Sequence, residues 1–145
     1  MSSYPKDVIR DLIDGKLPWQ TTKPIMSDFK DEARFEIYVE ILQERVPWKE
    51  RILLPIGEHL YIVEKGRERV VKCDCGHEFG DYHRNWKLGA LIYDRNPKEI
   101  YPGVTGPDPE WCLFREFYCP GCLTQLEVEA VPHGIPLIFS FEPSE

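Results

Sequence analysis

Two short cysteine motifs decide the fold, Cys73-Asp74-Cys75 and Cys119-Pro120-Gly121-Cys122. They lie far apart in the sequence, and each stands where a strand-like segment ends or turns. A close cysteine pair at a tight turn supplies two ligands of a tetrahedral metal site at little cost in chain entropy. Pro120 and Gly121 favour such a turn, because proline fixes φ and glycine permits unusual values. The pattern predicts one structural zinc ion, held by Cys73, Cys75, Cys119 and Cys122.

Other interpretations of the cysteines stay open. Four thiolates also suit iron, as in rubredoxin, and spacing does not separate the two metals. The thiols could also be buried and unligated. A thioredoxin-type redox pair is disfavoured, because a strand-like segment follows Cys122 where such a pair would open a helix. Cys112 is expected in the core, while His77 is an alternative ligand or a hydrogen-bond donor to one.

Strand signals surround both motifs. A hairpin is predicted over residues 59–64 and 68–72, with its turn at Lys65-Gly66. Further strands are expected at 112–119, 124–131 and 137–141. In the segment 124–131, apolar residues alternate with polar and acidic ones, which is typical of a half-buried strand. The apolar set is Leu126, Val128 and Ala130, and the other set is Gln125, Glu127 and Glu129. Before the first of these strands, residues 94–110 are expected to form a long loop rich in proline and glycine.

The first part of the chain contains no cysteine and reads as helical. Apolar residues recur at helical spacing within 5–15, and a second helix is predicted from about residue 28 or 31 to Arg45. Each helix is followed by a Pro-Trp pair, Pro18-Trp19 and Pro47-Trp48. We expect both tryptophans to fill the core, with contact to a partner protein as the alternative. The fold class is therefore α+β, a helical N-terminal segment at residues 1–57 followed by a β-rich, zinc-ribbon-like domain at 58–145.

Composition limits the function further. The chain has 145 residues, a net charge of −7, 42% hydrophobic and 30% charged residues, which suits a small folded protein. The acidic balance argues against nucleic-acid binding, and no apolar run is long enough to span a membrane. Without a signal-peptide pattern, we expect a cytoplasmic protein with reduced thiols. No phosphate-binding loop, HExxH motif, nucleophile elbow or dinucleotide fingerprint occurs, so no catalytic residue is assigned.

Two sequence blocks resemble a known family. The first runs Cys73-Asp74-Cys75-Gly76-His77 and continues to Asn85-Trp86-Lys87. The second runs Tyr118-Cys119-Pro120-Gly121-Cys122 and continues to Leu126-Glu127-Val128-Glu129-Ala130. Both resemble the small zinc-binding subunit of acetone carboxylase and its counterpart in acetophenone carboxylase. Leu123 stands where the comparable turn is expected to carry glycine.

The resemblance implies a function that the residues alone do not. Such enzymes are ATP-dependent ligases that carboxylate a ketone with bicarbonate to give a β-keto acid. Their larger subunits carry ATP, any further metal and the chemistry, and the small subunit is part of the hetero-oligomer. The resemblance thus implies a non-catalytic subunit that is inactive alone. Two alternatives remain, a rubredoxin-like iron electron carrier and a zinc-ribbon adaptor for protein interactions.

Overall fold

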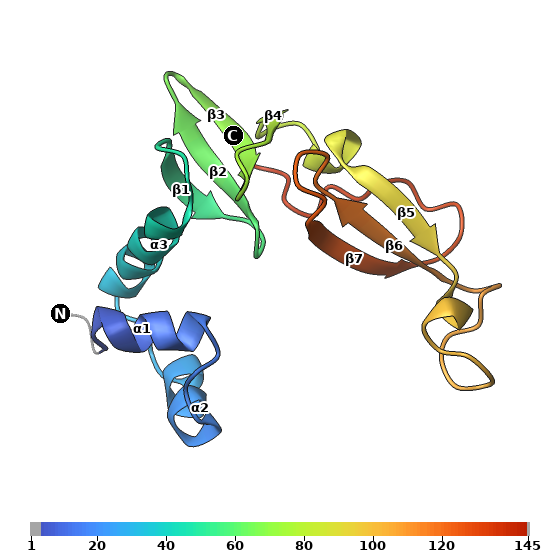
Figure 1. Ribbon diagram of the computed structural model, residues 1–145, viewed down its shortest axis with the longest axis horizontal. Helices are drawn as coiled ribbons and strands as arrows, with labels where there is room; N and C mark the ends of the chain where they lie inside the picture. Colours follow the sequence, from blue (N-terminus) through green and yellow to red (C-terminus); the bar gives the residue numbers. More distant parts are fainter. Residues whose placement is uncertain (1–3, 145) are drawn as a thin grey trace. The chain divides into compact units, whose positions relative to one another are not determined.

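The protein is described by a computed structural model, which covers residues 4–144 and divides the chain into two compact units, Met1–Lys49 and Glu50–Glu145. The first unit holds three helices, and the second holds two antiparallel sheets (Figure 1). This order confirms the α+β class with helices first and a β-rich part second. None of the helices in the described part of the chain is long and apolar enough to cross a membrane.

The predicted helices are α1 (Lys6–Ile13) and α3 (Ala33–Arg45). Helix α1 begins after Pro5, whose φ of −69° suits a helix start, and it ends just before Gly15, whose φ is 66°. Charged side chains join α1 to α3, because Lys6 Nζ lies 2.6 Å from Glu44 Oε1 and Arg10 Nη2 lies 3.0 Å from Glu44 Oε2. These ion pairs are exposed, so each contributes little to the free energy of folding.

Helix α2 (Trp19–Ser27) was not expected from the sequence. Pro24 and two threonines make this segment a poor helix former. It forms because Pro18 acts as the N-cap residue, with its carbonyl accepting hydrogen bonds from the N–H groups of Thr21 and Thr22, and because Ile25 is buried. The core prediction is wrong for Trp19, which begins this helix with 63% of its surface exposed.

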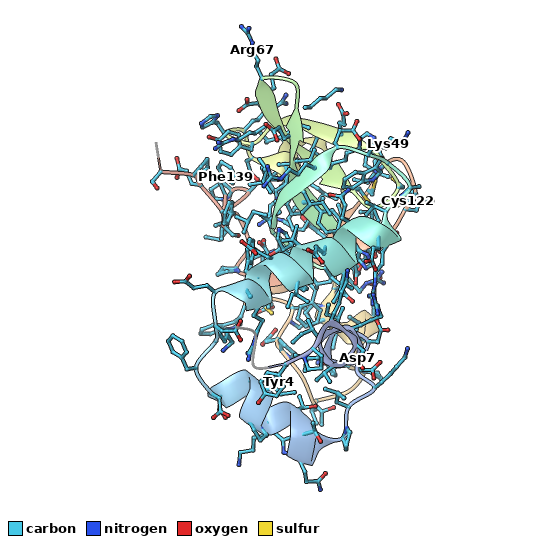
Figure 2. The ribbon with its side chains drawn as sticks, turned by 90° about the vertical axis from the view of Figure 1, so that its left-hand side faces the viewer. Tyr4, Asp7, Lys49, Arg67, Cys122 and Phe139 are labelled. Atoms are coloured by element: carbon cyan, nitrogen blue, oxygen red, sulfur yellow. The ribbon has the colours of Figure 1, made fainter. Side chains whose placement is uncertain are left out.

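The first sheet contains β1 (Arg51–Pro55), β2 (Leu60–Lys65), β3 (Glu68–Cys73) and β4 (Glu78–Asp81), in that spatial order. The predicted hairpin is confirmed as β2–β3, and its turn uses Gly66 with a φ of 63°. Arg67 marks the free tip of this hairpin (Figure 2). Strand β3 delivers Cys73 at its last residue, so the hairpin positions the first cysteine motif.

The second sheet has the order β5 (Leu91–Arg95), β6 (Leu113–Tyr118) and β7 (Gln125–Val131). The predicted β6 and β7 strands are confirmed, and the more buried face of β7 is the one that carries Glu129 rather than the one that carries Val128. Val128 is 46% exposed, whereas the Glu129 side chain is only 14% exposed. The reason is a buried lysine, described below, that turns the acidic face of β7 inward.

A short 3₁₀ helix, η1 (Trp86–Gly89), lies between the two sheets in the sequence and joins their cores. The Trp86 ring packs edge-on against Phe79 on one side and Phe117 on the other, with both ring centroids 5.8 Å away. The buried cluster around it draws on both sheets and includes two of the motif cysteines. Its members are Leu60, Ile62, Val71, Cys73, Phe79, Trp86, Phe117 and Cys119. The second unit therefore has one core that ends at the cysteines.

The C-terminal segment follows β7 without forming the strand that the sequence suggested at 137–141. It runs back from the end of β7 towards the first sheet (Figure 1). Side chains hold its backbone in place of a strand ladder: Lys87 Nζ donates to the Ile138 carbonyl at 2.8 Å, and Arg115 Nη1 donates to the Ile135 carbonyl at 2.8 Å. Lys87 is 1% exposed and also pairs with Glu129 and Glu127.

Candidate metal centre

The two cysteine motifs meet at one place. Cys73 ends β3 and Cys75 follows it, while Cys119 and Cys122 belong to the turn between β6 and β7. All four Sγ atoms lie within 4.8 Å of one another. The close pairs join the two sheets, with 3.8 Å between the sulfurs of Cys73 and Cys122 and 3.7 Å between those of Cys75 and Cys119.

These distances fit a tetrahedral metal site. A zinc–sulfur bond of about 2.3 Å places neighbouring sulfurs of a tetrahedron about 3.8 Å apart. The observed pairs agree with that spacing, and they are far longer than a disulfide bond of about 2.05 Å. Cys73 and Cys119 are buried, while Cys75 and Cys122 are exposed, and Cys122 lies at the surface (Figure 2). The donor set therefore suits one thiophilic ion held at the edge of the core.

Backbone and hydroxyl groups are arranged to support negative charge on the sulfurs. The N–H groups of His77 and Gly121 donate to the Sγ atoms of Cys75 and Cys119, each at 3.4 Å. The hydroxyl of Thr124 lies 3.2 Å from Cys122 Sγ, and with the Thr124 N–H it lowers the pKa of the Cys122 thiol to about 7. Burial raises the pKa of Cys73 and Cys75, so a bound cation is needed to hold those two as thiolates.

Close packing makes Gly121 a requirement of the second turn. A Cβ atom at this position would lie 3.0 Å from His77 Cβ and 3.2 Å from Cys75 Sγ. The two motifs are thus packed against each other through the glycine. Leu123 closes the same turn with a φ of 63°, and its N–H donates to the Cys119 carbonyl at 2.8 Å. The turn keeps the geometry expected of glycine at this position, although leucine occupies it.

The remaining candidates lie outside the sulfur cluster. Cys112 is half-buried and precedes β6, whereas Cys119 follows it, so about 20 Å of strand separates them. Among residues 4–144, the metal-competent cluster consists of four cysteines and no histidine. His77 contributes its N–H, while its ring packs edge-on against Phe79 with a centroid distance of 4.8 Å.

Two supporting groups escaped the sequence reasoning. His59 Nδ1 contacts Asp74 Oδ2, and the Asp74 N–H donates to the His59 carbonyl at 3.1 Å. This pair connects the first cysteine motif to the loop before β2. A contact between residues so far apart in the sequence cannot be predicted from local spacing. The second group is Lys87, which the sequence analysis places in the Asn85-Trp86-Lys87 segment without assigning it a role. In the structure it is a buried cation that pairs with Glu127 and Glu129.

Comparison with known proteins agrees with the resemblance. The family model for the acetone carboxylase gamma subunit matches residues 46–144, which contain both sheets and all four clustered cysteines. Over 97% of its length, the chain is 43% identical to the acetone carboxylase gamma subunit of Xanthobacter autotrophicus and covers 88% of that protein. It is also 39% identical to the acetophenone carboxylase beta subunit of Aromatoleum aromaticum, over 48% of this chain and 58% of that protein. This chain belongs to the acetone carboxylase gamma subunit family.

Proposed function

We propose that this chain is the small, non-catalytic, zinc-binding subunit of a multisubunit, ATP-dependent ketone carboxylase, which converts acetone or acetophenone and bicarbonate to a β-keto acid. One observation carries the metal part of the proposal, the four sulfurs of Cys73, Cys75, Cys119 and Cys122 at tetrahedral spacing. Family membership supports the carboxylase part. Reduced thiols suit a cytoplasmic protein.

The proposed role of the zinc is structural. Four thiolates leave no open coordination position, so the ion cannot activate water or bicarbonate. It would instead join β3 to the β6–β7 turn, and binding energy at such a site is also folding energy. The same four sulfurs suit iron, and a rubredoxin-like electron carrier is the alternative. Elemental analysis and visible absorption decide between them, because iron–thiolate charge transfer colours the protein red and zinc leaves it colourless.

Catalysis is assigned to the larger subunits. The sequence contains no phosphate-binding loop, and a net charge of −7 does not favour binding of ATP and bicarbonate, which are both anionic. We therefore expect the isolated zinc-loaded chain to release no phosphate from ATP, with or without a ketone. Adding it to the larger subunits should restore ATP-dependent carboxylation, which is measured as phosphate and β-keto acid formed. Turnover above background by the isolated chain would contradict this assignment.

The partner is expected to contact the N-terminal segment, residues 1–57, and the loop 94–110, rather than nucleic acid or membrane. Exposed aromatic side chains in both segments support this proposal, namely Trp19, Phe29 and Tyr101. Hydrogen exchange on the free and assembled protein measures the contact. We expect slower exchange in the assembly across residues 17–48 and 94–110. Equal exchange in both states over these residues would reject the assignment.

A further inference from the structure

The second sheet has an open edge at β5. Within residues 4–144, β5 pairs with β6 alone, and no other backbone segment forms a hydrogen bond to it. In an antiparallel ladder, alternate residues direct their N–H and C=O groups away from the neighbouring strand. The outer side of β5 therefore presents backbone donors and acceptors without a partner strand, which is the chemistry that another extended segment recognises.

The first three side chains of β5 are apolar and exposed on both faces of the sheet. Leu91 and Tyr93 share one face and are each 47% exposed, while Ile92 lies on the other face and is 42% exposed. A strand added beside β5 would cover apolar surface on both faces and would also pair with the open backbone.

The two charged residues of β5 do not protect this edge. Charged side chains commonly discourage an incoming strand, provided that they stay in water beside the open backbone. Here both are bonded to the neighbouring strand β6. Asp94 Oδ1 accepts from Arg115 Nε at 3.0 Å, and the Arg95 guanidinium donates to both carboxylate oxygens of Glu116, at 2.7 and 2.9 Å.

The other three edge strands of the two sheets carry protective features. Strand β1 contains Pro55 and a shift in its register with β2. Strand β4 has only four residues and an irregular register with β3. Strand β7 carries Glu129, an acidic side chain that points inward to the buried Lys87. Strand β5 contains no proline and keeps a regular register with β6, so it is the edge best suited to an added strand.

We propose that an extended, largely apolar segment of a larger subunit of the carboxylase pairs with β5 and adds a strand to the second sheet. The identity of this partner rests on the proposed function. The segment would continue from β5 onto the loop 94–110 that follows it, where Tyr101 is 47% exposed and Val104 is fully exposed.

A second copy of this chain fits this edge less well. Two β5 strands that pair antiparallel about a two-fold axis place their following loops at opposite ends of the ladder, so Tyr101 and Val104 of each copy lie outside it. A ladder five residues long covers less than the about 1,600 Å² that a stable interface buries. A longer segment of another subunit covers the edge and the loop together.

Ile92→Lys tests the inference, because a lysine on an edge strand opposes the addition of another strand. The variant should bind the larger subunits at least about tenfold more weakly, measured by titration calorimetry. Val128→Lys is the matched control, since Val128 is 46% exposed and lies on β7, the opposite edge strand of the same sheet. This control should bind as the wild type does. Both isolated variants should keep the metal and unfold near the urea concentration of the wild type.

Hydrogen exchange of the single amides of β5 separates strand addition from contact through side chains alone. In the isolated chain, amides bonded to β6 should exchange slowly and the alternate, outward amides should exchange fast. In the assembly, the outward amides should slow at least about tenfold, so the alternation disappears. Contact through side chains alone would leave the alternation in place.

Three results would overturn the inference: unchanged binding of Ile92→Lys, equal weakening by Ile92→Lys and Val128→Lys, or alternation that persists in the assembly. A wild-type dimer in sedimentation analysis that dissociates in Ile92→Lys would also overturn it, by making a second copy the occupant. If the wild-type chain does not assemble with the larger subunits, the proposed function falls together with this inference. Assembly in which β5 stays open removes the inference alone.

Discussion

A Cys119→Ser variant should lose its metal ion and fail to hold the two sheets together. Cys119 is fully buried, and its sulfur lies 3.7 Å from that of Cys75, which follows β3 of the first sheet. Structural zinc sites of this kind bind with about 10–16 kcal/mol of apparent free energy, which exceeds the stability of most domains of this size. The β unit of the variant is therefore expected to be unfolded or protease-sensitive at pH 7. Metal content by elemental analysis and limited proteolysis measure the two effects.

Cys112 offers a matched control for this variant. It is a half-buried cysteine outside the sulfur cluster, at the other end of β6. Cys112→Ser should keep one metal ion per chain, with a change in stability of about 1 kcal/mol or less. Cys75→Ser should lose the ion although its side chain is exposed, because three thiolates do not complete the site. Metal loss in Cys112→Ser together with retention in Cys75→Ser would show that the ligand set is wrong.

Lys87→Met should destabilise the protein by about 3–5 kcal/mol, the typical cost of leaving a buried charge without its partner. The Lys87 side chain is 1% exposed, and its ammonium group contacts Glu129, Glu127 and the Ile138 carbonyl. Methionine fills a similar volume, so the loss of stability reports the removal of the charge rather than a change in packing. Residues 132–144 should also become more sensitive to proteases, because the ammonium group no longer holds their backbone. Urea unfolding of the metal-loaded chain measures the first effect.

The control for Lys87 is Lys65, which pairs with Glu78 at 2.8 Å but is 49% exposed. Lys65→Met should change stability by less than about 1 kcal/mol, since water screens this pair. Adding Glu129→Gln to Lys87→Met should recover part of the loss, because the uncompensated carboxylate is then gone. Equal effects of Lys87→Met and Lys65→Met would show that the buried ammonium group does not stabilise this fold.

Elements whose causes are local could be predicted. Helix α1 follows from apolar spacing after a proline, and the β2–β3 hairpin follows from a Lys65-Gly66 turn between two apolar runs. Helix α2 could not be predicted, because its residues are poor helix formers and its stability comes from a buried Ile25 and the accepting carbonyl of Pro18. Trp19 illustrates the same limit, because the presence of a large apolar residue after a predicted helix does not show whether its side chain is buried.

The sequence by itself identified two close cysteine pairs, because the spacing and turn residues of each pair are local properties, and the fold then brings their four sulfurs together. Only the tertiary structure decided which face of β7 is buried. The alternation of Val128 and Glu129 is compatible with either face, and a lysine more than forty residues earlier in the chain turns the acidic face inward. A period of two tells which residues share a face, whereas the electrostatic partner that selects the buried face comes from another element through folding.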